Sequence, residues 1–263
     1  MNRTTIGYGT DRSQVADLHL PASNESTTPL AVVVVIHGGF WGSAYGRELG
    51  TPLADDLAQH GVAGWNIEYR RLGNGGGWPS TFDDVGAAID ALSTRAMAAA
   101  GGRLDLARVV AIGHSAGGHL AVWAAGRAGL PPNAPGADPR VRLTGVVSQA
   151  GVLDLAHGAE HHLGGGAVPK LLGGSPHQFP DRYAQASPYS RLPIGVPATL
   201  VHGLDDDVVP IEQSDRYQAA AEARGDRVDE IRLQGVGHYE LIDVASDAWA
   251  RCRTAALGYV AAR

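Results

Sequence analysis

Short runs of β-branched and other apolar residues, separated by helical patterns, restrict this chain to a layered fold. The run at residues 31–36, AVVVVI, is apolar on both faces, which is typical of a strand covered by helices on its two sides. A stretch of alternating polarity at residues 14–20 precedes it and predicts an antiparallel strand near a sheet edge. Further strands are predicted at residues 62–67, 108–112, 143–147, 198–201 and 228–233.

Helical patterns lie between the predicted strands, at residues 48–60, 80–100, 117–126, 213–224 and 245–262. Alternation of strands and helices with right-handed crossovers predicts the α/β class, with a mostly parallel, doubly wound sheet and helices on both faces. We expect a single domain over residues 1–263. Glycine runs and prolines interrupt the pattern at about residues 151–192, which we interpret as a small lid-like insert.

Composition excludes several other classes. The 36 glycines and 15 prolines follow no Gly-X-Y period, so a collagen helix is excluded. A net charge of −6 gives no reason to expect nucleic acid or an anionic membrane as partner. No apolar run approaches the roughly 20 residues of a membrane-spanning helix, and the N-terminus lacks the pattern of a signal peptide. Cys252 is the single cysteine. We therefore expect a cytoplasmic globular protein; its oligomeric state is left open.

Residues 113–117 read GHSAG and stand between a predicted strand and a predicted helix. This is the setting of the G-x-S-x-G nucleophile elbow, in which a serine occupies a tight turn from strand to helix. Flanking glycines let neighbouring backbone approach, and the N-terminus of the following helix favours developing negative charge. We therefore predict Ser115 as a catalytic nucleophile.

A free serine hydroxyl is a weak nucleophile and needs a base that a third group orients. In this type of site the acid follows the serine in sequence and the histidine comes last. His238 stands in a glycine-rich loop after the last predicted strand, and we predict it as the base. The strand at residues 198–201 is followed by three aspartates. Spacing alone leaves the acid open between Asp205, Asp206 and Asp207.

The segment 37–41, HGGFW, directly follows the strand at residues 31–36. Acyl transfer needs N–H donors from the residue after the serine and from such a loop. We predict an oxyanion hole made by the backbone amides of Gly39, Phe40 and Ala116. The two glycines allow the loop to fold close to the serine. His37 is interpreted as structural, bonded to backbone within the loop.

Four motifs, HGGFW, GHSAGGHLA, HGLDDDVVP and GVGHYEL, together resemble the α/β-hydrolase superfamily over residues 15–262. Within it the chain is similar to small serine esterases with an HGG-x-W loop, a group that includes the kynurenine formamidases (arylformamidases). The resemblance implies the α/β-hydrolase fold, and it implies Asp206 as the acid of the triad. The loop departs from the HGGG of hormone-sensitive-lipase-like enzymes at Phe40, so their acyl pocket is not carried over to this chain.

Side chains beside these motifs are candidates for substrate contact. Phe40 is expected to line the acyl side of the pocket, and Trp78, between a glycine run and a proline, is expected to form a wall. Trp41 and His114 complete the predicted substrate-binding set.

No metal or organic cofactor is expected. Residues 157–161 match the zinc-protease pattern H-x-x-E-H, but Gly158 lies inside it and a glycine run begins at residue 164. We interpret this segment as a polar part of the insert.

The sequence therefore predicts a serine hydrolase that cleaves small acyl or aryl carboxylic esters through an acyl-enzyme. Its partner is a small-molecule ester or amide. The alternatives are an arylformamidase acting on N-formylkynurenine, a peptidase on the same fold, and a non-catalytic ligand-binding protein that uses the scaffold.

Overall fold

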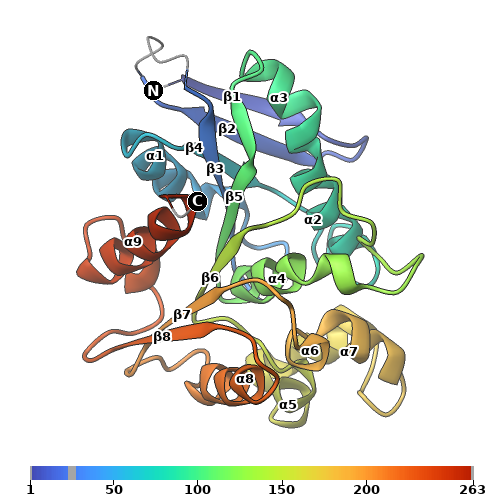
Figure 1. The fold of residues 1–263 in the computed structure, drawn as a ribbon. Helices are drawn as coiled ribbons and strands as arrows, with labels where there is room; N and C mark the ends of the chain where they lie inside the picture. The colour runs from blue at the N-terminus through green and yellow to red at the C-terminus, as the bar shows by residue number, and fades with distance from the viewer. Residues whose placement is uncertain (1, 23–27, 262–263) are drawn as a thin grey trace.

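A single twisted sheet organises the computed structural model, which describes residues 2–22 and 28–261 (Figure 1). Residues 1, 23–27 and 262–263 of the predicted domain lie outside the described part. The strand order is β1-β2-β4-β3-β5-β6-β7-β8, in which the β1–β2 and β2–β4 pairs are antiparallel and the other pairs are parallel. The strands are β1 (Asn2–Gly7), β2 (Val15–Leu20), β3 (Leu30–Ile36), β4 (Ala63–Ile67), β5 (Leu104–His114), β6 (Gly145–Gln149), β7 (Ala198–Gly203) and β8 (Val228–Leu233).

The alternation of side chains along β3 shows why the sheet is covered on both faces. Val32, Val34 and Ile36 point into one apolar cluster, whereas Val33 and Val35 point into another. Each of these five side chains is at most 2% exposed. A strand that is apolar on both faces is stable only between two layers of helices, as the sequence predicts.

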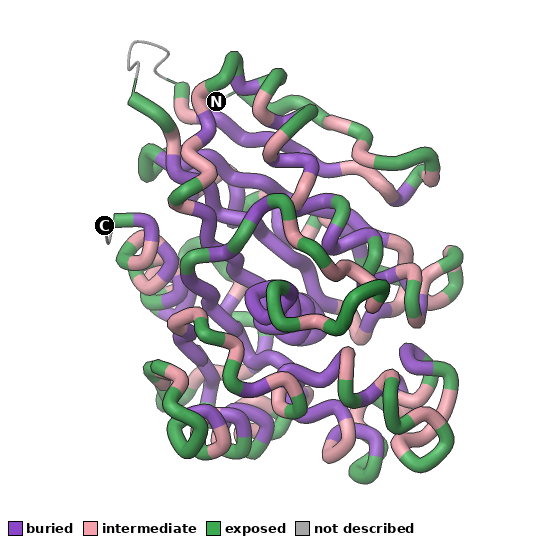
Figure 2. Tube along the Cα trace, turned by 45° about the vertical axis from the view of Figure 1, so that its right-hand side comes forward, coloured by how far each residue is buried: buried purple, intermediate pink, exposed green. Residues whose placement is uncertain are grey.

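The helices divide between the two faces of the sheet (Figure 1). Buried residues of α1 and α9 join one apolar cluster; those of α2, α4 and α8 join the other, together with those of the insert. In Figure 2 the central strands of the sheet are buried and the outer surfaces of the helices and loops are largely exposed. The helices are α1 (Thr51–Gln59), α2 (Ser80–Asp90), α3 (Arg95–Ala99), α4 (Ala116–Ala125), α5 (Leu155–Glu160), α6 (Leu163–Leu172), α7 (Pro180–Ala186), α8 (Glu212–Ala223) and α9 (Asp247–Ala261).

The largest differences between the predicted pattern and the structure are in two places. The helix predicted at residues 80–100 is wrong as one element, because Thr94 leaves helical geometry (φ −131°, ψ −92°) between α2 and α3. The edge strand β1 is mostly exposed and was not predicted, because its sequence NRTTIG carries no apolar period. The predicted C-terminal helix ends within the described residues at Ala261, and Ala262 lies outside them. Over residues 151–192 the chain forms the short helices α5, α6 and α7.

Backbone packs directly on backbone where β5 turns into α4. An added Cβ on Gly117 would lie 2.0 Å from the carbonyl oxygen of Ile36, at the end of β3. An added Cβ on Gly113 would lie 2.1 Å from the carbonyl oxygen of Gly117. The two glycines therefore let the start of α4 sit against the ends of both central strands, with Ser115 between them.

We predict that Gly117→Ala lowers the free energy of unfolding by about 2–3 kcal/mol, because the new methyl group must displace rigid backbone. Urea unfolding of the purified variant measures this change. Gly258→Ala is the matched control, since Gly258 lies in α9 and an added Cβ there meets nothing within 4 Å. The control is expected to stabilise the protein by up to about 1 kcal/mol. Equal unfolding curves for the two variants would contradict the close contact.

Candidate active site

Ser115 occupies a strained turn at the carboxyl edge of the parallel strands. Its backbone has φ +57° and ψ −119°, which costs a side-chain-bearing residue of this kind about 1–3 kcal/mol. Two hydrogen bonds hold the turn: the Ser115 N–H donates to the Gln149 carbonyl at 2.8 Å, and the Ser115 carbonyl accepts from the His119 N–H at 3.1 Å. This conformation matches the nucleophile-elbow geometry that the sequence predicts.

His238 and Asp206 form a buried pair beside this turn. His238 Nδ1 lies 2.7 Å from Asp206 Oδ2, and their side chains are 3% and 1% exposed. A carboxylate only accepts, so Nδ1 carries the proton and Nε2 of a neutral His238 is left as the basic nitrogen. The other carboxylate oxygen, Oδ1, accepts the backbone N–H groups of Val208 and Val209, each at 2.8 Å.

Asp206 is held in its ionised form. Burial alone would raise the pKa of its carboxyl group, but hydrogen bonds from His202, His238 and the Val209 amide outweigh burial and hold that pKa well below its usual range. His202 Nε2 lies 3.4 Å from Asp206 Oδ2.

Asp205 and Asp207 are exposed, and the described contacts pair neither of them with a histidine. Of the three consecutive aspartates, the structure therefore brings Asp206 to His238.

The loop that carries His238 is tied to the central strands at two points. His114 Nε2 donates to the His238 carbonyl at 2.9 Å, and the two rings lie 4.4 Å apart. The Gln149 side-chain amide donates to the Leu241 carbonyl. Burial, followed by the charge of His238, lowers the pKa of His114 to about 3, so His114 stays neutral. Gln149 was not singled out from the sequence, because its two contacts are with residues distant along the chain.

The loop after β3 presents open backbone donors beside the serine. An added Cβ on Gly38 would lie 3.1 Å from Ser115 Cβ, so the loop is in contact with the turn. Gly39 has φ +106°, a conformation that suits glycine. Within residues 2–22 and 28–261, no group accepts a hydrogen bond from the N–H of Gly39, Phe40 or Ala116. These amides are the donors that the sequence predicts for an oxyanion hole.

Ser115 and His238 open into the same cavity, which has a volume of about 150 Å³. Its walls are mainly apolar, and two of its residues are exposed at the surface, Tyr45 (50%) and Tyr239 (64%). Among the lining residues that the sequence analysis did not name, Tyr239 could have been found from its position next to His238. Tyr45, Leu49 and Ile242 lie outside every motif and left no such signal. The lining residues are Gly39, Phe40, Tyr45, Leu49, His114, Ser115, Val208, His238, Tyr239 and Ile242.

Two predicted substrate contacts lie away from this cavity. The prediction for Trp41 is wrong, because its side chain is fully buried and its indole N–H donates to His119 Nδ1 at 3.1 Å. Trp78 does not line the cavity; its ring packs edge-to-face on Phe82, with centroids 5.1 Å apart. Phe40 and His114 do line it, and their contact with substrate stays a prediction.

The insert contacts the lining residue Phe40. An added Cβ on Gly164, in α6, would lie 2.5 Å from the Phe40 ring, so backbone of the insert lies against this side chain. None of the cavity's described lining residues comes from 151–192. The lid-like role of the insert stays a prediction.

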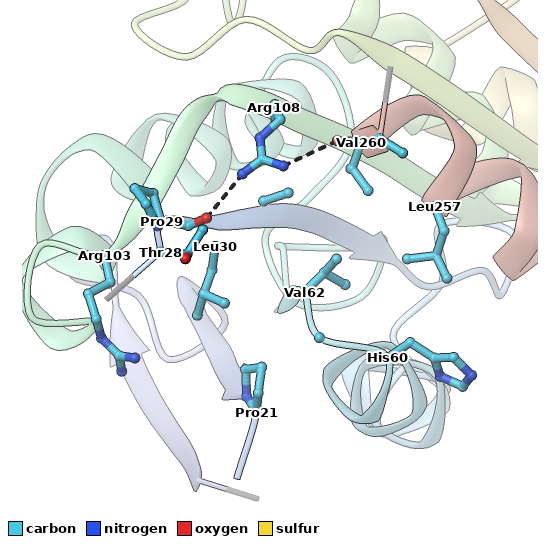
Figure 3. Close-up of a pocket in the computed structure, with 13 residues that line it drawn as sticks. Pro21, Thr28, Pro29, Leu30, His60, Val62, Arg103, Arg108, Leu257 and Val260 are labelled. Carbon is cyan, nitrogen blue, oxygen red and sulfur yellow. Dashed lines mark hydrogen bonds between the residues drawn. The ribbon is translucent and has the colours of Figure 1, made fainter. Parts of the chain in front are cut away.

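A larger cavity, of about 540 Å³, lies at the opposite edge of the sheet (Figure 3). It is lined by residues at the amino ends of the parallel strands, among them Leu30 and Val62. Arg108 crosses it and donates to the carbonyl oxygens of Pro29 and Val260. The Arg108 guanidinium therefore joins the segment before β3 to α9 at this edge of the sheet, away from Ser115.

The H-x-x-E-H segment forms local contacts. His157 and His161 stack with their centroids 4.0 Å apart, and His161 Nδ1 bonds to the His157 carbonyl. Within the described ranges, no group of three or more His, Cys, Asp or Glu side chains is arranged to hold a metal ion. None of the helices in the described part of the chain combines the length and the apolar character needed to cross a bilayer.

Comparison with known proteins supports a common architecture. The BD-FAE family model matches residues 16–220. The curated isoprenylcysteine α-carbonyl methylesterase ICME of Arabidopsis thaliana is 26% identical over 257 residues, which is 91% of this chain and 57% of the relative. The chain thus spans little more than half the length of this relative.

Two solved structures superpose closely. A truncated carbohydrate esterase from gut microbiota is 22% identical with a TM-score of 0.83, covering 100% of this chain and 97% of that one. A bifunctional GH43-CE protein of Bacteroides eggerthii is 27% identical with a TM-score of 0.76, covering 90% of this chain and 35% of that one. The expected α/β-hydrolase fold is confirmed. The formamidase-like subgroup and the cytoplasmic location stay predictions.

The Trp41–His119 contact generates a prediction about pH. His119 accepts from Trp41 at Nδ1 and donates to the Ala186 carbonyl from Nε2 at 2.9 Å, so it fits only as a neutral ring. Burial lowers the pKa of His119 to about 4. Since the unfolded chain takes up the proton first as pH falls, the free energy of unfolding decreases from about pH 6.5 down to the folded pKa.

We expect His119 to account for a loss of about 2 kcal/mol between neutral pH and about pH 5. Urea unfolding at a series of pH values measures the slope. His119→Gln keeps one acceptor and one donor without a titrating ring and should reduce the slope. His177→Gln, at an exposed position, is the control and should leave the slope unchanged. An identical slope in wild type and His119→Gln would contradict the assignment.

Proposed function

The chain belongs to the BD-FAE family, and from that premise we propose that it is a serine hydrolase that cleaves carboxylic esters through an acyl-enzyme. One observation carries the proposal: the His238–Asp206 pair and the strained Ser115 open into one cavity. Ser115 is the nucleophile, His238 the base and Asp206 the acid. ICME is named a methylesterase and the gut-microbiota structure a carbohydrate esterase, so both names support ester cleavage.

The reaction proceeds in two halves. In the first, His238 Nε2 takes the proton from Ser115 Oγ as the oxygen attacks the ester carbonyl, and the N–H groups of Gly39, Phe40 and Ala116 stabilise the oxyanion. The tetrahedral intermediate collapses, the alcohol leaves with the proton from His238, and the acyl group stays on Ser115. In the second half a water molecule, deprotonated by His238, attacks the acyl-enzyme and releases the acid.

Asp206 acts through His238. Its bond to Nδ1 keeps the tautomer whose Nε2 can accept a proton, and its ionised carboxylate stabilises the imidazolium that then forms. The amides of Val208 and Val209 and the nearby His202 hold the carboxylate in place. The base therefore enters the reaction already oriented.

Small acyl or aryl esters are the substrate class that fits. The cavity of about 150 Å³ is below the roughly 300–1,000 Å³ of pockets that hold drug-sized ligands. Phe40, Leu49, Val208 and Ile242 give it apolar walls. A short acyl group fits inside such a space, whereas a long chain has to extend past Tyr45 or Tyr239 into solvent.

The predicted roles are tested by removing each group separately. Ser115→Ala should lower kcat for p-nitrophenyl acetate by about 10⁴-fold or more, and Asp206→Asn by about 10³–10⁴-fold, because the wrong histidine tautomer is then favoured. Asp205→Asn and Asp207→Asn are matched controls at adjacent, exposed positions and should keep near wild-type rates. Wild-type rates for Ser115→Ala would overturn the proposal. If Asp206→Asn kept the wild-type kcat while Asp205→Asn or Asp207→Asn lost activity, the assignment of the acid would be overturned.

Cavity size predicts a preference for short acyl chains. We expect kcat/KM to fall at least about ten-fold from p-nitrophenyl butyrate to p-nitrophenyl octanoate, since the longer chain cannot be enclosed. Ile242→Ala removes part of the wall and should narrow this ratio. Faster cleavage of the octanoate by the wild-type protein would contradict the size argument. N-formylkynurenine in the same panel tests the formamidase alternative.

A further inference from the structure

His37, at the start of the loop after β3, has two hydrogen-bond partners that can only accept. Its Nδ1 lies 2.8 Å from the Gly38 carbonyl oxygen, and its Nε2 lies 2.9 Å from Glu68 Oε1. Both side chains are buried, His37 at 0% and Glu68 at 6% exposed. A neutral imidazole has a single N–H and can satisfy one of these acceptors. Two donors are available only when the ring carries both protons.

The other contacts of the Glu68 carboxyl group are all with donors, which favours its ionised form over a protonated one. Oε1 also accepts the Tyr69 N–H at 2.9 Å, while Oε2 accepts the Arg47 N–H at 3.1 Å and lies 3.3 Å from Arg71 Nη2. Burial tends to raise the pKa of this carboxyl group, but the hydrogen bond and charge of His37, the Tyr69 amide and Arg71 lower it overall. Glu68 is therefore the ionised partner.

The remaining neighbours fix the ring without neutralising it. Tyr69 stacks on His37, with centroids 4.5 Å apart and an interplanar angle of 11°, and its hydroxyl donates to the His37 carbonyl at 2.9 Å. An added Cβ on Gly46 would lie 2.5 Å from Glu68 Oε2 and 2.7 Å from Glu48 Oε2, so a second carboxylate shares this region. Arg71 is the cation on the opposite oxygen of Glu68.

The contact with Gly38 links this cluster to the proposed oxyanion hole. The Gly38 carbonyl and the Gly39 N–H belong to the same peptide group, with the carbonyl toward His37 and Gly39 at the lining of the cavity. A charged donor on a peptide oxygen polarises the group and makes its N–H a stronger donor on the other side. A positive charge on His37 would therefore make the Gly39 N–H, one peptide group away, a stronger donor to the developing oxyanion.

We propose that His37 is a buried imidazolium held by Glu68, and that this ion pair strengthens and orients the Gly39 N–H as an oxyanion donor. His37 and Glu68 are positioning residues, since neither lines the cavity. The kinetic consequence rests on the proposed function, whereas the charge state of His37 does not.

NMR of the ring nitrogens in histidine-labelled, unmodified protein tests the charge state directly. An imidazolium at His37 gives two protonated nitrogens with similar shifts at neutral pH; a neutral ring gives one protonated and one unprotonated nitrogen. The His37 signal is assigned by its loss in His37→Gln. Two protonated nitrogens are expected, and a neutral His37 overturns the proposal whether or not any variant folds.

Glu68→Gln tests the link to the oxyanion hole, because it removes the charge while keeping the shape of the side chain. We expect kcat for p-nitrophenyl acetate to fall about ten-fold with KM nearly unchanged, less than the full loss of an oxyanion donor. A trifluoromethyl ketone, which forms an oxyanion on Ser115, should bind more weakly by a similar factor. A merely structural role would not give this matched loss.

Asp55→Asn is the matched control. Asp55, in α1, pairs with another buried histidine, His19 in β2, at 2.8 Å, and none of its described bonds reaches the loop after β3. It should keep wild-type kcat and inhibitor affinity. An unchanged kcat and inhibitor affinity in a folded Glu68→Gln protein overturns the link. If Ser115→Ala is inactive in the same assay, that result leaves the proposed function standing.

Discussion

The direct backbone contact between the end of β3 and the start of α4 is the constraint on which the site depends. With no side chain at Gly117, the helix approaches the Ile36 carbonyl closely enough to leave Ser115 at a sharp turn. The same contact brings the loop after β3 against the serine, through Gly38. Ser115 and a set of open amides therefore lie together because no side chain separates the two main-chain segments.

Buried neutral histidines and ionised carboxylates then organise the polar groups around this turn. His114 and His119 are buried as neutral rings, and each ties distant segments together, His114 to the His238 loop and His119 to Trp41. Carboxylates that receive several hydrogen bonds stay ionised, as at Asp206 and Glu68. Fixed donors and acceptors of this kind lower the reorganisation needed when charge develops during catalysis, which is the condition for electrostatic stabilisation.

Local patterning predicts the elements that are stabilised locally. The run AVVVVI predicts β3 to within one residue, and G-x-S-x-G predicts the β5–α4 turn. Strand burial and glycine packing each require particular residue types at neighbouring positions, so both are visible in the sequence. The exposed strand β1 has no hydrophobic pattern in its sequence, because its pairing with β2 stabilises it. The backbone conformation of Thr94 ends a helix, and the hydrophobic periodicity of the sequence does not reveal this break.

Contacts between distant segments explain the rest of the site. Among three adjacent aspartates, the fold decides which one meets His238, and spacing cannot. Trp41 follows Phe40 directly, yet positive φ at both residues sends the two side chains in different directions, one to the cavity and one to the core. Gln149, at the end of β6, and Glu68, directly after β4, are each bonded to a loop far along the chain, so neither residue stands out in the sequence.

The central claim, that Ser115 is a nucleophile activated by His238, is tested most directly by intact-protein mass spectrometry after incubation with a fluorophosphonate. The account predicts one phosphonyl adduct per chain, located on Ser115 by peptide mapping and absent from Ser115→Ala. It predicts much slower labelling of His238→Ala, because the serine then has no base. An unlabelled wild-type protein, or an adduct that persists in Ser115→Ala, would contradict it.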